Sequence, residues 1–114
     1  MSENFAIERS DTIDFINYDE KSGLLQLHII DGMDWEDRPV HMKLMIDKLN
    51  NYLLYIDTKQ FEEKYPETKR IEILIRHCFD QPDECMVIYN KVSAVLENLF
   101  ENSALIVEKG DISK

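Results

Sequence analysis

Hydrophobic and polar residues alternate along four short stretches of the chain, and this pattern predicts strands with one buried face. In the second stretch Leu25, Leu27 and Ile29 share one side, and in the third Ile71, Ile73 and Ile75 do the same. The predicted strands are Thr12–Asn17, Leu24–Asp31, Arg70–Phe79 and Ala104–Lys109. The polar segment 18–23 ends in a glycine that favours a turn, so the first two strands are predicted to form an antiparallel hairpin.

One longer segment, Pro39–Asp57, repeats hydrophobic residues every three to four positions and is predicted to be a helix. Asp37 can cap its N-terminus, and the first helical turn tolerates a proline. The residues predicted to face the core are Met42, Met45, Leu49, Tyr52, Leu53 and Ile56. The polar residues expected on the solvent side are Lys43, Asp47, Lys48, Asn50 and Asn51.

A second helix is predicted to open at segment 80–84, which again combines acidic residues with a proline, and to run to about Phe100. Its hydrophobic side is predicted to consist of Met86, Val92, Val95, Leu96 and Leu99. Between the first helix and the third strand, Thr58–Tyr65 is predicted to add a short helical turn before Pro66 ends it.

The element order ββαβαβ contains two strand–helix–strand crossovers, which place parallel strands in one sheet with right-handed connections. We therefore expect an α/β protein, an α+β two-layer sandwich whose mixed four-stranded sheet carries both helices on one face. The order of the strands stays open. The predicted organisation is a flexible N-terminal arm at 1–11, a single domain at 12–109 and a flexible tail at 110–114.

The sheet face away from the helices is predicted to be half aliphatic, which is more than a solvated face needs. Its expected residues are Leu24, Gln26, His28, Ile30, Glu72, Leu74, Arg76 and Ile106. We predict a partner or a second copy there, with Leu24, Ile30, Leu74, Arg76 and Ile106 in contact. The alternative is that the N-terminal segment with Phe5 and Ile7 covers this face. Trp35 either anchors its acidic loop or serves as an additional contact residue for a partner.

The chain has 23 acidic and 13 basic residues and a formal net charge of −10. Such a charge argues against binding to nucleic acid or to an anionic membrane surface, and it steers a basic protein toward the chain. No apolar run approaches the roughly 18 residues that span a bilayer, and the N-terminus lacks the features of a secretory signal. Cys78 and Cys85 show no CxxC spacing. We expect a cytoplasmic protein with reduced thiols.

Histidine and carboxylate side chains cluster around the end of the second strand and the start of the first helix. A metal site there would use His28, Asp31, Asp34, Asp37 and His41, whose side chains are competent metal ligands. Against such a site, a helix N-terminus repels cations, and the acidic residues can serve as caps. The metal site is therefore the alternative hypothesis.

A nucleophilic site is the weaker possibility. His77 and Cys78 are neighbours on a strand, so their side chains point to opposite faces. Cys85 falls in the first turn of the second helix, where the helix dipole lowers the pKa of a thiol, and His77 could reach it. No third orienting group is evident. We therefore predict no catalytic residue, no enzymatic activity and no cofactor.

Several motifs resemble a family of small uncharacterised bacterial proteins described as a domain of unknown function. They are Ile13-Asp-Phe-Ile with its hairpin, Asp34-Trp35, His41, Lys48-Leu-Asn-Asn-Tyr-Leu-Leu-Tyr-Ile-Asp, Lys59-Gln-Phe and Tyr65-Pro66. The resemblance extends over roughly residues 12–108. It implies a cytoplasmic bacterial protein with the same α/β layout, and it carries no activity with it.

Two functional hypotheses follow. The first is a non-enzymatic protein-binding module that uses the open sheet face or the acidic loop 31–37, for example as the immunity-type partner of a basic toxin. The alternative is a metal- or small-molecule-binding protein that uses the His28–His41 cluster.

Overall fold

The computed structural model describes residues 13–79 and 81–108 and contains a single four-stranded sheet covered by two helices. The elements are β1 (Phe15–Asp19), β2 (Leu24–Asp31), α1 (Arg38–Asp57), the 3-10 turn η2 (Gln60–Glu63), β3 (Arg70–His77), α2 (Cys85–Leu99) and β4 (Ser103–Glu108). The predicted ββαβαβ order and the α+β layout are confirmed. No helix in this described part of the chain is long and apolar enough to span a membrane.

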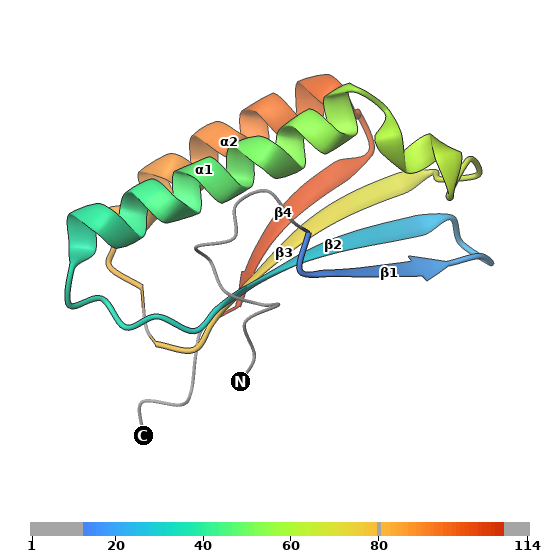
Figure 1. The fold of residues 1–114 in the computed structure, drawn as a ribbon. Helices are drawn as coiled ribbons and strands as arrows, with labels where there is room; N and C mark the ends of the chain where they lie inside the picture. Colours follow the sequence, from blue (N-terminus) through green and yellow to red (C-terminus); the bar gives the residue numbers. More distant parts are fainter. Residues whose placement is uncertain (1–12, 80, 109–114) are drawn as a thin grey trace.

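The strands lie in the order β1-β2-β3-β4, which the sequence left open. β1 pairs antiparallel with β2, and β3 pairs parallel with both β2 and β4. Both helices lie side by side on the same face of the sheet and run in the same direction (Figure 1). The carboxyl ends of β2 and β3 therefore lie at the end of the molecule where both helices begin.

The first hairpin strand is shifted relative to the prediction: it begins at Phe15 and continues to Asp19. The reason lies in Asp14, whose carboxylate accepts a hydrogen bond from the Ile30 backbone N–H at 2.9 Å. In a longer β1, a backbone carbonyl would accept this hydrogen bond instead. β3 ends two residues before the predicted Phe79. Thr12 and Lys109, the arm 1–11 with Phe5 and Ile7, and the tail 110–114 lie outside the described residues.

The two helices begin in different ways. α1 is capped as predicted: the Asp37 side chain accepts a hydrogen bond from the Val40 N–H, and Pro39 occupies the first turn. The predicted cap of α2 is wrong, because its N-cap residue is Glu84, which makes no side-chain capping bond. The Cys85 N–H instead donates to the carbonyl of Pro82 at 3.1 Å, so the proline precedes the helix.

The core lies between the inner face of the sheet and the helices. Its fully buried strand residues are Leu25, Leu27, Ile29, Ile71, Ile73 and Ile75, all predicted to face inward. Two predictions for the helices are wrong. Lys48, expected in solvent, is completely buried, whereas Met86 and Val95, expected in the core, are 46% and 44% exposed. Tyr89 and Cys85 occupy the inner side of α2 instead.

The turn between β1 and β2 depends on Gly23. Its φ is +73°, and a Cβ atom built there would lie 2.9 Å from the backbone oxygen of Glu67. Its own carbonyl accepts hydrogen bonds from the N–H groups of Lys69 and Arg70. A side chain at this position would therefore be strained both by the backbone conformation and by the neighbouring segment.

We expect Gly23→Ala to lower the free energy of unfolding by about 1–3 kcal/mol, because alanine is strained at positive φ. Urea denaturation measures the change. Gly32→Ala is the matched control: no heavy atom lies within 4 Å of the added Cβ, so its effect should stay within about 0.5 kcal/mol. Equal stability of the two variants would contradict the strained turn.

Candidate functional site

Asp31, the last residue of β2, places a completely buried carboxylate at the carboxyl edge of the parallel strands. His41 of α1 reaches it through Nε2, at 2.8 Å from Oδ1 and 2.7 Å from Oδ2. His77, which pairs with Asp31 across β2 and β3, reaches Oδ2 through Nδ1 at 2.8 Å. The Met33 N–H adds a bond of 3.2 Å to Oδ1. One carboxylate thus joins β2, β3 and α1.

Both ring nitrogens of His41 face acceptors. Nε2 faces the Asp31 carboxylate, and Nδ1 lies 3.0 Å from the backbone oxygen of Asp34. Because a carbonyl and a carboxylate can only accept, both contacts are satisfied together when His41 carries two protons. Asp31 and His41 then form a buried ion pair, the kind of pair that is tolerated only when the remaining polar atoms also have partners.

His77 extends the network to α2. Its Nε2 lies 2.8 Å from the Tyr89 hydroxyl, so with Nδ1–H donating to Asp31 the ring accepts from the tyrosine. Burial raises the pKa of Tyr89 above its ordinary value, which keeps the hydroxyl protonated and able to donate. Cys85 also contacts Tyr89, and its Sγ lies 3.5 Å from the sulfur of Met42.

The buried position of Cys85 changes the expectation for its thiol. Burial raises its pKa, the reverse of the lowering expected from the helix dipole. Tyr89 contacts both Cys85 and His77. Both Cys78 and Cys85 are free thiols. These side chains therefore form one hydrogen-bonded network in which the raised pKa keeps the Cys85 thiol protonated.

Trp35 covers this network. Its ring stacks on His41 with centroids 3.5 Å apart and planes inclined by 14°, and its Nε1–H points to the Phe79 carbonyl at 3.4 Å. These contacts agree with the loop-anchoring role that the sequence suggested for Trp35. Outside it, the described acidic side chains at this end are exposed: Asp34, Glu36, Asp37, Asp83 and Glu84. Arg38 pairs with Glu84 at 3.1 Å.

A second buried ion pair joins the middle of α1 to the start of the hairpin. Lys48 Nζ lies 2.6 Å from Asp14 Oδ1, and both side chains are fully buried. Burial raises the pKa of Asp14, opposed by Lys48 and by the Ile30 N–H. Tyr52 adds two bonds nearby: its hydroxyl donates to the His28 carbonyl and accepts from the Asp14 N–H.

The outer face of the sheet, opposite the helices, is organised in rows across the strands. Strand register places Phe15, His28, Leu74 and Ile106 in one row, which we call the outer apolar row. Phe15 is 51% exposed and meets the His28 ring edge-on at 5.1 Å. The other three side chains are half-buried. This row is continuous across all four strands.

Rows that contain charged residues flank the outer apolar row, and these charges are paired within the face. On one side Arg76 Nε lies 3.0 Å from Glu108. On the other side Gln26 donates to Glu72 at 3.0 Å, and Arg70 pairs with the same carboxylate at 3.0 Å. The hydrogen bond from Gln26, followed by Arg70, lowers the pKa of Glu72. The face therefore presents an apolar strip between ion pairs that are already formed.

The structure does not assemble the predicted metal ligands as one group. Asp31 and His41 contact each other, Asp34 offers its backbone oxygen to His41, and Asp37 caps α1. His28 projects from the outer face of the sheet, whereas Asp31 lies on the inner face. Within residues 13–79 and 81–108, no three His, Cys, Asp or Glu side chains are grouped so as to hold a metal ion.

Five of the predicted partner-binding residues share the outer face of the sheet, whereas the sixth, Trp35, stacks on His41. Leu74 and Ile106 belong to the outer apolar row, and Ile30 and Arg76 lie side by side in the next row. Leu24 lies two rows away on the other side, opposite Arg70. All except Arg76 are half-buried, and the row of Gln26 and Glu72 separates Leu24 from the other four.

A family model described as a family of unknown function, DUF6572, matches residues 5–106. The chain belongs to this family. The resemblance noted from the sequence is thereby confirmed at the level of an uncharacterised domain family. No curated protein and no solved structure matches the chain.

Sequence reasoning missed the roles of Tyr89 and Lys48. Tyr89 lies three positions before Val92, on the same side of the second helix, so its spacing could have placed it in the core. Nothing local marked Lys48 as buried, because its partner Asp14 is distant in sequence. The sequence hypotheses relate His77 only to Cys78 and Cys85, whereas its contacts are Asp31 and Tyr89.

We expect Asp31→Ala to lower the free energy of unfolding by about 2–5 kcal/mol, because it leaves the buried ring nitrogens of His41 and His77 without their shared acceptor. Chemical denaturation followed by tryptophan fluorescence measures the change. Asp34→Ala removes an exposed carboxylate but keeps the backbone oxygen that His41 uses, so it should cost less than about 1 kcal/mol. Similar losses in both variants would contradict the central role of Asp31.

We expect the pH dependence of stability to change in His28→Leu. Burial, followed by the charge of Arg76, lowers the pKa of His28 below its usual 6.5. The unfolded chain therefore binds the proton first, so protonation of this ring destabilises the fold as the pH falls below 6.5. The free energy of unfolding, measured from neutral pH downward, should fall less steeply in His28→Leu than in the wild type. Identical slopes would exclude this contribution.

Proposed function

We propose that this chain is a non-enzymatic protein-binding module that holds a basic protein against the outer face of its sheet. The observation that carries the proposal is the outer apolar row, which strand register makes continuous across four strands and which neither α1 nor α2 covers. Monomeric proteins seldom leave contiguous apolar strips exposed, and such strips mark interaction surfaces.

The charges on the outer face support an apolar contact at its centre. Arg76 is paired with Glu108, and Arg70 with Glu72, so their charged groups are already compensated within the face. A partner would bury Leu74 and Ile106 without leaving an isolated charge, which avoids the main cost of a dry interface. The flanking pairs would form the polar rim that surrounds a typical contact.

The charge of the whole chain supports a basic partner. The net charge is −10, and the exposed acidic side chains beyond β2 and β3 concentrate negative charge at one end of the sheet. Opposite charge accelerates encounter and selects among partners more than it adds to affinity. The same field disfavours nucleic acid, whose phosphates repel it. An immunity-type partner of a basic toxin is one protein of this class.

The buried chemistry supports a role without catalysis. His41, His77, Asp31 and Tyr89 are fully or almost fully buried and bonded in one network, and burial raises the pKa of the Cys85 thiol. None of these groups is placed to meet a substrate without opening the fold. A cytoplasmic location fits the two free cysteines.

A photo-crosslinking amino acid at position 74, introduced in the host cell, tests this proposal. We expect it to form an adduct with a basic protein, and we expect the same reporter at Lys64, an exposed residue beyond η2, to form none. With the identified protein in hand, Leu74→Glu should weaken binding at least about tenfold, as expected for a central contact. Gln60→Glu adds the same charge away from the outer face and should leave the affinity unchanged.

Three outcomes would contradict the proposal. The adduct could form equally from position 64, the captured protein could be acidic, or Leu74→Glu could bind as well as the wild type. A thermal melt of Leu74→Glu that matches the wild type ensures that lost binding is not lost folding. Rising salt should slow association with the partner, because the attraction between the two charged proteins is screened.

A further inference from the structure

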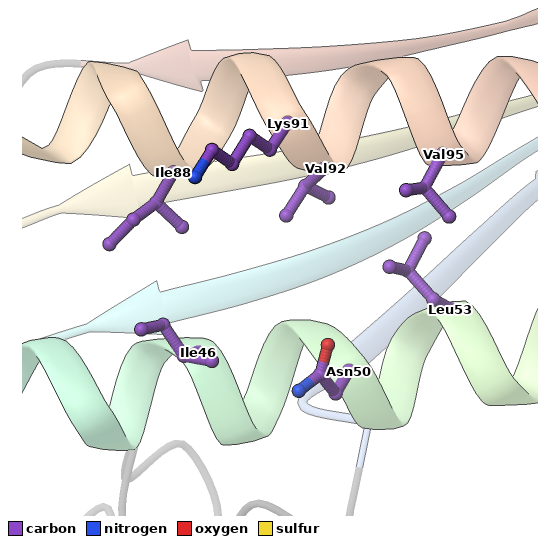
Figure 2. A pocket seen from close by; sticks show the side chains of 7 residues that line it. All are labelled: Ile46, Asn50, Leu53, Ile88, Lys91, Val92 and Val95. Carbon is purple, nitrogen blue, oxygen red and sulfur yellow. The ribbon is translucent and has the colours of Figure 1, made fainter.

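The helix layer carries most of the exposed large hydrophobic side chains. Of the seven found among the described residues, six lie on α1 or α2. Three of them, Ile46, Leu54 and Val95, border a groove between the helices. Its larger hollow has a volume of about 310 Å³, with Leu53 and Val95 pointing toward each other and Ile46 and Ile88 at one end (Figure 2).

One exposed stripe of α1 runs beside this groove and has a symmetric chemistry. In order along the helix it contains Lys43, Ile46, Asn50, Leu54 and Asp57, all exposed and spaced by three or four residues. The stripe therefore presents a cation, an apolar residue, an amide, an apolar residue and an anion. Asn50 is its midpoint: the apolar residues lie four positions to either side, and the two charges lie seven positions to either side.

We propose that the groove is occupied by a second copy of this chain, whose α1 lies antiparallel to α1 of the first copy. A two-fold axis beside Asn50 would place Ile46 of each copy against Leu54 of the other. The same axis would place Lys43 against Asp57 of the other copy and the two Asn50 amides against each other. Every position of the stripe then meets a chemically matching position, which is the requirement for a self-complementary interface.

The end of α1 gives a second reason for this arrangement. Asp57 is the last residue of the helix, where the macrodipole is negative, and the last turn contains no basic side chain. A carboxylate there is unfavourable, and a cation from outside would relieve it. Lys43 is 76% exposed at its side chain and now pairs with Asp47 at 3.0 Å on the same helix. From the second copy it could also reach Asp57.

The groove gives the second copy a place to pack. α1 has 20 residues and so is about 30 Å long, and two adjacent helices are about 20 Å wide. Such a face can bury an area of the order of the roughly 800 Å² per partner of a standard interface. Ile46 and Leu54 of the second copy would fill the hollow between α1 and α2. The result is a four-layer molecule with the helices inside and both sheets outside.

The net charge of −10 on each copy opposes this association. General repulsion between two anionic copies is screened as salt increases, whereas apolar packing is retained. The dimer should therefore be weaker at low ionic strength and stronger near about 0.15 M salt. This inference is independent of the proposed function, because it leaves the outer faces of both sheets open at opposite ends of the dimer.

Sedimentation equilibrium of the full chain tests the inference. A protein concentration of about 100 µM allows dissociation constants up to that order to be detected. We expect the wild type to have twice the monomer mass of 13.5 kDa. Leu54→Lys should be monomeric. Phe15→Lys is the matched control, because Phe15 is 51% and Leu54 is 53% exposed, yet Phe15 lies on the sheet. It should leave the dimer unchanged.

Charge reversal separates the specific pairing from net charge. K43E and D57K should each weaken the dimer at least about tenfold, because each sets like charges against each other across the axis. The double variant K43E/D57K should recover wild-type affinity. Net charge alone predicts the reverse for D57K, since it reduces the repulsion between the two copies. Circular dichroism melts of the exposed-site variants confirm that they are folded.

A wild type that is monomeric at every salt concentration would overturn the inference. So would a dimer that persists in Leu54→Lys, since it would use another surface. A stronger dimer in D57K, or no recovery in the double variant, would exclude the antiparallel register. Binding of a basic protein at Leu74 can succeed or fail in any of these cases, so the two proposals are tested separately.

Discussion

The buried carboxylate of Asp31 is the interaction on which the arrangement of the other elements depends. Burying a carboxylate is expensive unless hydrogen-bond donors surround it, and here they come from α1, β3 and the loop after β2. Apolar packing between a sheet and a helix tolerates small displacements along the helix, whereas these directional bonds do not. His41 therefore fixes how far α1 lies along the sheet. His77 and Tyr89 extend the same constraint to α2, so one acid sets the position of both helices.

Local sequence patterns correctly predicted those elements in which buried and exposed positions repeat regularly from end to end. β2 alternates strictly between fully and partly buried residues, and its predicted bounds, Leu24–Asp31, match those observed. Lys48 shows the limit of such patterns. A lysine on an amphipathic helix is normally assigned to solvent, and only the distant Asp14 makes its burial tolerable. The same carboxylate explains why β1 begins late, because it accepts a hydrogen bond from the Ile30 backbone N–H. Both errors have one non-local cause.

Only part of the polar network at the strand ends could be predicted from the sequence. Asp31 and His41 lie close in sequence, on either side of one loop, so their proximity follows from a strand leading into a helix. His77 joins them only if β3 is the parallel neighbour of β2 in the observed register. Crossover rules establish that these strands are parallel but not that they are adjacent. His28 was grouped with the same cluster through its sequence proximity alone, although alternation already placed it on the opposite face from Leu27 and Ile29.

The two layers offer surfaces of different kinds, and the difference lies in how their charges are compensated. On the sheet, cross-strand neighbours such as Arg76 and Glu108 compensate each other, so these charged groups need no counter-charge from a partner. On α1, Asp57 ends a helix that has no basic residue in its last turn, so no side chain of that turn compensates the carboxylate. Association is most favourable in free energy where it also relieves an unfavourable charge interaction that exists in the separate molecules. Because the network around Asp31 already holds α1 in place, ordering this surface would cost little conformational entropy on association.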